Sequence, residues 1–271
     1  MSDNPIVFID SGVGGLPYLK MARENMPNEN FVYVADNKNF PYGEKSTKEL
    51  KSLIIDLIGK IIKKIDPKLV VIACNTASVV ALSTLREKFG IPFVGVVPAI
   101  KPAGEYVVNG TIGLLATTKT VTDPYTDDLI NQFASSCKVE KFAGIDLVDF
   151  VENKFLTSTE KEKMEVVFQA SKYFENLKID ALVLGCTHFV YLKDYFKKSI
   201  SKNVDIIDSV EGVCQQITRI INKETVKLDS SLIDISESNK TGLFYITGNQ
   251  FVISKYQNFS KEFRLTWGGK L

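Results

Sequence analysis

The chain has 271 residues, enough for a large core and for two domains. Its 33 basic and 32 acidic residues leave a net charge of +1, and the lysines are spread out, so we expect no nucleic-acid partner. No signal peptide and no apolar run of membrane-spanning length is apparent, so we expect no membrane partner. The four cysteines form no CxxC pair, which argues against a zinc site or a disulfide scaffold and favours a cytoplasmic location.

The first part of the chain alternates predicted strands and helices. Short runs of Val, Ile and Phe predict buried strands at 5–9, 31–35, 69–73 and 92–97. Apolar residues at helical spacing predict helices over 47–65 and 77–89. The glycine-rich loop 10–15 does not complete a GxGxxG because residue 17 is proline, which weakens a dinucleotide hypothesis. Its glycines are better explained by close approach of the backbone to a small ligand.

Pro98 and Pro102 predict a crossover into a second domain, where the order of elements starts again. Further elements are predicted as strands at 111–118, 179–184, 204–209 and 243–247, and as helices at 124–133, 160–177 and 210–222. The last strand is expected to join the first domain's sheet. The polar stretch 223–240 is expected to be a surface excursion.

The positions of two strand ends suggest an internal repeat. Asp10 precedes Cys74 by 64 residues, and Thr118 precedes Cys186 by 68. We therefore expect an α/β fold with two similar parallel-sheet domains. Residues 1–97 with 208–271 would form the first, carrying Cys74, and residues 98–207 would form the second, carrying Cys186.

Both of these cysteines follow a run of strand formers and precede small polar residues. Cys74 is followed by Asn75 and Thr76, and Cys186 is followed by Thr187 and His188. In parallel sheets ligands bind beyond the carboxyl ends of the strands, so both thiols are expected to face one crevice. A single cysteine in such a place is more often a small buried hydrophobe, but the repeated context favours function. Cys137 and Cys214 lack this context and are interpreted as structural.

Two thiols around one site suit three kinds of chemistry. A redox pair is disfavoured because the CxxC-like spacing is absent. A nucleophile with a base would use Cys186 and His188, the only histidine, but would leave Cys74 unexplained. Proton transfer to and from carbon, with one thiolate as base and the opposite thiol as acid, uses both halves of the chain. Asp10, His188 and Glu152 could then orient the thiols or carry protons.

Four segments together resemble the cofactor-independent, two-cysteine glutamate racemases of the aspartate/glutamate racemase superfamily. They are Asp10–Leu16, Pro41–Gly43, Ala73–Ala77 and Leu184–His188. The resemblance implies two α/β domains around a pseudo-twofold axis, with the site between them. It implies no cofactor, and interconversion of L- and D-glutamate for peptidoglycan and hence for the cell wall and cell shape.

The resemblance also implies roles for individual residues. Cys74 and Cys186 would be the two acid/base residues, assisted by Asp10, His188 and Glu152. The substrate-binding positions would be Asp10, Ser11, Tyr42, Gly43, Asn75, Thr76, Thr118, Thr187 and His188. We expect glutamate as the small-molecule substrate and a homodimer. The alternatives are another two-cysteine racemase or isomerase, such as an aspartate racemase, and a non-catalytic binding protein.

Overall fold

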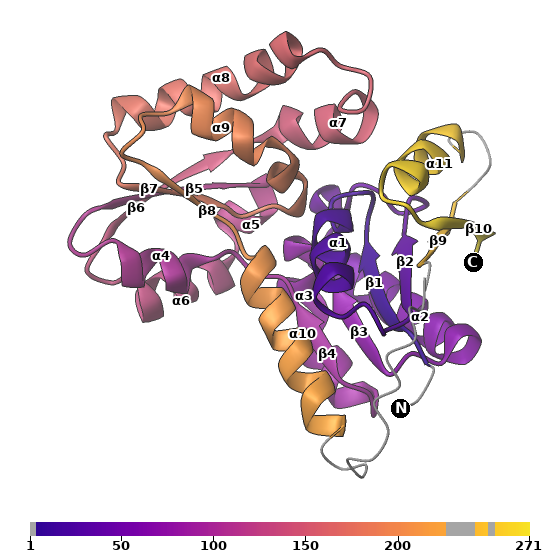
Figure 1. Ribbon diagram of the computed structural model, residues 1–271. Helices are drawn as coiled ribbons and strands as arrows, with labels where there is room; N and C mark the ends of the chain where they lie inside the picture. The colour runs from indigo at the N-terminus through magenta and orange to yellow at the C-terminus, as the bar shows by residue number, and fades with distance from the viewer. Residues whose placement is uncertain (1–3, 226–241, 249–252) are drawn as a thin grey trace.

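The computed structural model describes residues 4–225, 242–248 and 253–271, which form two parallel sheets, each flanked by helices (Figure 1). The first sheet has the strand order β10-β9-β2-β1-β3-β4, and the second has the order β6-β5-β7-β8. The strands of the first sheet are β1 (Ile6–Asp10), β2 (Phe31–Ala35), β3 (Leu69–Ile72), β4 (Phe93–Gly95), β9 (Leu243–Ile246) and β10 (Thr266–Lys270). Those of the second are β5 (Thr111–Ala116), β6 (Lys138–Ala143), β7 (Ala181–Leu184) and β8 (Asp205–Ile207).

The two sheets repeat one topology. Strands β2-β1-β3-β4 of the first sheet and β6-β5-β7-β8 of the second lie in the same relative order, and every described strand pair is parallel. The expected α/β class with two parallel sheets is therefore confirmed, and β9 joins the first sheet beside β2, as expected. The boundaries at 97/98 and 207/208 stay a prediction.

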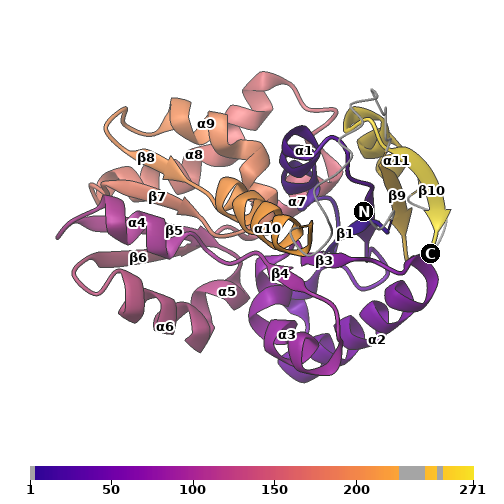
Figure 2. The same cartoon turned by 60° about the horizontal axis from the view of Figure 1, so that its bottom comes forward.

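Helices connect the strands and cover both faces of each sheet. They are α1 (Leu16–Asn25), α2 (Thr47–Ile65), α3 (Asn75–Lys88), α4 (Ile100–Tyr106), α5 (Thr118–Thr122), α6 (Pro124–Phe133), α7 (Ile145–Asn153), α8 (Glu160–Asn176), α9 (Lys193–Ser199), α10 (Val210–Thr225) and α11 (Ile253–Glu262). Two 3-10 helices, η1 (Tyr42–Glu44) and η2 (Thr187–Leu192), lie at strand exits. Figure 2 shows α2 and α3 on one side of the first sheet and α1 on the other, with α10 crossing beside α1. No helix within the described ranges is long and apolar enough to cross a bilayer.

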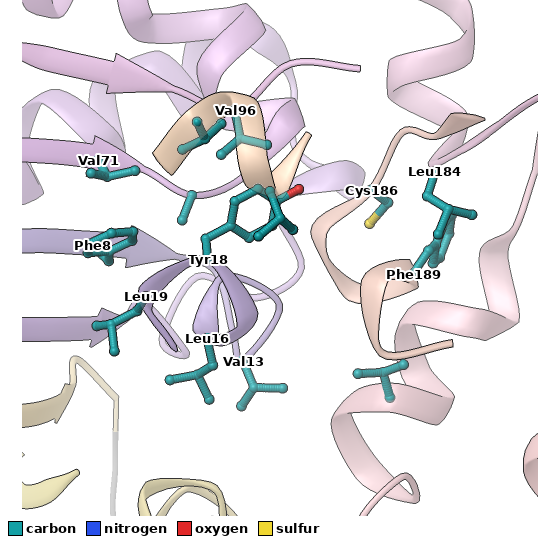
Figure 3. Packing of buried hydrophobic residues seen from close by; sticks show 14 of the residues in the cluster. Phe8, Val13, Leu16, Tyr18, Leu19, Val71, Val96, Leu184, Cys186 and Phe189 are labelled. Atoms are coloured by element: carbon teal, nitrogen blue, oxygen red, sulfur yellow. The ribbon is translucent and has the colours of Figure 1, made fainter. Parts of the chain in front are cut away.

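The strand residues face two cores in alternation, because successive side chains point to opposite faces of a sheet. Val7 and Ile9 join the core beneath α2 and α3. Ile6 and Phe8 join a second core, which continues from α1 through η2 into the second domain. Figure 3 shows Cys186 within this second core, on the side of the second domain that faces α1. The described parts of the two domains thus share one apolar cluster.

The structure departs from the sequence-based elements in a few places. Strand β6 was not predicted, and the chain does not end with β9, since α11 and β10 follow it. Pro102 lies in the first turn of α4, a position that tolerates proline, so the crossover is helical. Of the expected excursion 223–240, residues 223–225 belong to α10 and the rest lies outside the described residues.

Candidate active site at the strand ends

The candidate site lies where strands of both sheets end. Asp10 is the last residue of β1, Cys74 follows β3, and Cys186 follows β7. All three side chains are buried, with relative exposures of 0%, 9% and 6%. The two thiols, 112 positions apart in the chain, lie close enough that negative charge on Cys186 raises the pKa of Cys74. A separate groove of about 1350 Å³ near α10 and β4 is lined by none of the candidate residues.

Cys74 caps the amino end of α3 and adopts extended backbone angles there. Burial raises the pKa of its thiol well above the ordinary value, and the neighbouring Asp10 carboxylate raises it further. The backbone N–H groups of Ala77 and Thr76, at the start of α3, oppose this shift because they favour the thiolate. At neutral pH this side of the site therefore presents a protonated thiol that has N–H donors ready for the thiolate.

Asp10 joins the two halves of the site. Its Oδ1 accepts hydrogen bonds from the Gly12 N–H (2.8 Å) and the Ser11 hydroxyl (3.3 Å). Its Oδ2 accepts one from the Thr187 hydroxyl (3.0 Å), which belongs to the second domain. Burial raises the pKa of Asp10 and outweighs the opposing effect of the His188 charge. The carboxyl group thus lies near Cys74 and is hydrogen-bonded to the residue that follows Cys186.

His188 and Glu152 form a buried pair beside Cys186. The His188 Nδ1 lies 3.9 Å from the Cys186 sulfur, and its Nε2 lies 2.8 Å from Glu152 Oε1. Burial alone would lower the pKa of His188, but hydrogen bonds to Cys186 and Glu152 outweigh it and raise that pKa well above 6.5. Burial acts to raise the pKa of Glu152, yet the bond and charge of His188, together with Lys255, leave it lowered. An imidazolium therefore faces Cys186.

The glycine-rich loop allows the two domains to approach closely. A Cβ on Gly12 would lie 1.7 Å from Glu152 Oε1, and one on Gly14 would lie 2.5 Å from both His188 Nδ1 and Thr187 Oγ1. The backbone N–H of Val13 donates to Glu152 Oε1 (2.6 Å). The sequence suggested that these glycines make room for a ligand; the structure shows that they make room for side chains of the second domain.

Asn75 is buried with both of its amide atoms unsatisfied. Among the described residues neither its Nδ2 nor its Oδ1 has a hydrogen-bond partner, although the side chain is only 3% exposed. Buried amides are normally hydrogen-bonded, so this one indicates a polar ligand that would supply the missing hydrogen-bond partners. Asn75 is the first residue of α3, adjacent to Cys74.

Threonines of both domains meet next to Asn75. The Thr76 hydroxyl lies 3.4 Å from that of Thr117 and 3.5 Å from that of Thr120. Thr118, the expected binding residue, is exposed at the start of α5. Thr117 and Thr120, which flank the expected Thr118, were not singled out in the sequence.

Tyr42 and Gly43 lie in η1, at the exit of β2. The Tyr42 hydroxyl donates to Asp36 Oδ2 (2.7 Å) and its ring is buried. Burial raises the pKa of Tyr42 well above 10, so it remains a hydrogen-bond donor. A Cβ on Gly43 would have only the Thr117 side chain of the second domain within 4 Å, at 3.9 Å, so the backbone at Gly43 is not crowded.

Two further residues around the site were not found from the sequence. Asp36, directly after β2, accepts hydrogen bonds from Tyr42, Asn39 and Thr247. Lys255 on α11 donates to Glu152 Oε2 (2.9 Å). The strand-end position was a usable signal for Asp36, whereas no pattern in the sequence marked Lys255. The other two cysteines make hydrogen bonds to residues outside the candidate set: the Cys137 thiol donates to the Val107 carbonyl, and the Cys214 sulfur accepts from the Asn25 side-chain amide.

Comparison with known proteins agrees with this arrangement. A sequence profile described as Asp/Glu/Hydantoin racemase matches residues 18–217, which contain both strand-end cysteines. The chain belongs to this racemase family.

Relatives within the racemase family are named glutamate racemases, which confirms the resemblance inferred from the motifs. One from Glaesserella parasuis is 37% identical over 98% of this chain and 95% of its own length. Another, from Shewanella sp. strain MR-7, is 42% identical over 80% of this chain and 79% of its own. The crystal structure of Escherichia coli glutamate racemase with L-glutamate and the activator UDP-MurNAc-Ala superposes with a TM-score of 0.83 and 30% identity. That match covers 99% of this chain and 98% of the other.

Proposed function

We propose that this protein is an amino-acid isomerase that interconverts L- and D-glutamate by thiol-mediated proton transfer at the α-carbon. The observation that carries the proposal is that the strand ends of separate sheets bring Cys74 near the buried carboxyl group of Asp10, which in turn accepts a hydrogen bond from Thr187, the neighbour of Cys186. Relatives of 37–42% identity that bear the name glutamate racemase support glutamate as the substrate.

In this mechanism one thiolate takes the α-proton and the opposite thiol supplies another. The Cα–H bond breaks as an S–H bond forms, and the electron pair left on carbon is delocalised into the adjacent carboxylate. The second S–H bond then breaks as a new Cα–H bond forms on the other face. By resemblance, Cys186 would act on L-glutamate and Cys74 on D-glutamate.

The surroundings of the two thiols suit this exchange of roles. Asp10 lies beside Cys74, and the His188–Glu152 pair lies beside Cys186, so each thiol has its own titratable neighbour. The N–H groups at the start of α3 would stabilise the Cys74 thiolate after the proton is lost.

The substrate would be held by polar groups that surround the thiols. The unsatisfied amide of Asn75 offers both a donor and an acceptor. Thr76, Thr117 and Thr120 cluster at the same place, and Ser11 and Thr187 flank Asp10. Burial of these groups excludes water, which strengthens their interaction with the charge that develops in the transition state.

The direct test is to incubate the pure protein with L-glutamate or D-glutamate and to follow optical rotation or chiral chromatography. We expect racemisation in both directions without added cofactor. Faster turnover of aspartate than of glutamate would assign the chain to an aspartate racemase instead. Inertness toward every acidic amino acid would support a non-catalytic binding protein. A requirement for pyridoxal phosphate or a metal would contradict the mechanism.

The two-thiol mechanism makes its own prediction in heavy water. The product enantiomer should carry solvent deuterium at the α-carbon from the first turnover, while unreacted substrate stays largely protiated at low conversion. Replacement of either Cys74 or Cys186 by serine should cripple racemisation in both directions, because serine is a much weaker acid than cysteine. Mass spectrometry of the separated enantiomers measures the labelling. Near-normal racemisation by either serine variant would end the two-base proposal.

Three wider expectations go with this function. D-glutamate would supply peptidoglycan synthesis, which implies a role in the cell wall and cell shape. A cytoplasmic location is expected from cysteine usage, and the four cysteines are free thiols in the structure. Cell fractionation tests this location. The expected homodimer is tested by light scattering of the purified protein, where a monomer mass would refute it.

A further inference from the structure

Lys255 connects the C-terminal part of the chain to the candidate site. It lies on α11, which follows β9 of the first sheet, and its Nζ donates to Glu152 Oε2 (2.9 Å) and Asn153 Oδ1 (3.3 Å). Both acceptors belong to α7, which connects strands of the second sheet. A single ammonium group therefore joins the two domains at the carboxylate that pairs with His188.

Glu152 is fully buried and is contacted at both carboxylate oxygens. Its Oε1 accepts from the Val13 N–H (2.6 Å) and lies 2.8 Å from His188 Nε2, and its side chain is 0% exposed. Backbone at Gly12 packs directly against the same oxygen. The described charged and titratable groups that interact with Glu152 are Asp10 on β1, Tyr33 on β2, His188 and Tyr191 on η2, and Lys255 and Tyr256 on α11.

Lys255 is itself held in place by aromatic rings. Its Nζ lies 4.6 Å from the ring centre of Tyr256 and 5.8 Å from that of Phe40. The Phe40 ring also faces His188, at 6.4 Å between ring centres. The lysine side chain is 22% exposed, so its charge is only partly screened by solvent.

A row of contacts results, running from the Lys255 ammonium through Glu152 and His188 to the Cys186 sulfur. A buried carboxylate without an opposite charge beside it tends to take up a proton, because burial penalises its charged form. The ammonium group next to Glu152 favours the carboxylate form, and the carboxylate in turn favours the imidazolium that faces Cys186.

We propose that Lys255 is a positioning residue for the reaction, which keeps Glu152 ionised and directed at His188 so that His188 presents a proton to Cys186. Lys255 does not touch the substrate in this scheme. The inference rests on the proposed racemase function and adds a residue to it that lies outside the strand-end segments.

The test is the pH profile of kcat/KM for glutamate racemisation. An opposite charge at this distance shifts a carboxyl pKa by about 1–3 units. In Lys255→Met the acid limb should therefore move to higher pH by about 1–3 units, with activity lost near pH 6 and recovered as pH rises. Lys255→Arg retains the charge and should keep the normal profile. Lys261→Met removes the same charge from the exposed face of α11 and should also keep it.

Added methylammonium provides a second readout, because the partly exposed Lys255 position is open to a small amine. It should restore activity to Lys255→Ala near pH 6 and leave Lys261→Ala unchanged. An unshifted acid limb in Lys255→Met, or a loss that is uniform across pH and accompanied by a lower melting temperature, would overturn the inference. Absence of racemisation by the wild-type protein would instead refute the proposed function.

Discussion

Replacement of Asn75 by leucine should stabilise the unliganded protein while it damages the site. Both amide atoms of Asn75 are buried without partners among the described residues. Each unsatisfied group costs about 1–3 kcal/mol of folding free energy. Leucine has nearly the same size and carries no polar atoms, so Asn75→Leu should raise the free energy of unfolding by about 1–3 kcal/mol after small packing losses.

The same change should weaken catalysis. If the amide is completed by a charged substrate, each lost hydrogen bond is worth about 1.5–3 kcal/mol, or roughly 10- to 150-fold in kcat/KM. Stability and activity would then move in opposite directions, as expected when a site carries unfavourable polar burial for the sake of its ligand.

Two measurements on the same samples check this reasoning. Thermal unfolding without substrate should show a melting temperature raised by about 2–4 °C for each kcal/mol, and chiral assays should show the loss of kcat/KM. Ser171→Ala is the matched control, because the Ser171 hydroxyl on α8 is also buried with no partner in the described part of the chain, but α8 carries no candidate site residue. It should gain stability and keep full activity. A lower melting temperature for Asn75→Leu, or an unchanged kcat/KM, would refute the argument.

Two other side chains carry separate predictions. The folded-state pKa of His188 lies well above 6.5, so its stabilising contribution is fully present below about pH 6.5 and is lost as pH rises through the folded value. The difference in free energy of unfolding between wild type and His188→Gln, measured in urea, should therefore shrink from about pH 6 to pH 10; a growing difference would contradict it. Tyr42→Phe removes the 2.7 Å bond to Asp36 but leaves that carboxylate with Asn39 and Thr247. It should fold normally by circular dichroism and lose about 1–3 kcal/mol, roughly 5- to 150-fold, in kcat/KM; an unfolded variant would show a purely structural role.

The sequence predicted the strands that are buried on both faces far better than those at the sheet edges. The runs before Cys74 and Cys186 consist of Val, Ile, Leu and Ala, and become β3 and β7, each between two neighbouring strands. Strand β6 (Lys138–Ala143) escaped prediction because it lies at an edge, is half-exposed and carries lysines and a glutamate.

The candidate site divides in the same way. Residues next to a strand end, such as Asp10 and Asn75, could be found because parallel strands place their exits together. Lys255 could not, because it acts through the packing of α11 against a helix of the other domain, about a hundred positions away. The threonines after β5 are an intermediate case: the sequence indicated Thr118, but the backbone turn at Thr117 directs the hydroxyls of Thr117 and Thr120 toward Thr76.

Burial of the two strand-end thiols has a practical consequence for measuring motion. Cys74 and Cys186 are 9% and 6% exposed, so an alkylating reagent reaches them only when this part of the protein opens. Their labelling rate then equals the open fraction multiplied by the intrinsic reactivity of the thiol, as in hydrogen exchange. Half-exposed Cys137 supplies an internal reference for reagent quality within the same molecule. Peptide-resolved labelling over time would therefore report how often the closed interior admits a small molecule, without any attached dye or engineered probe.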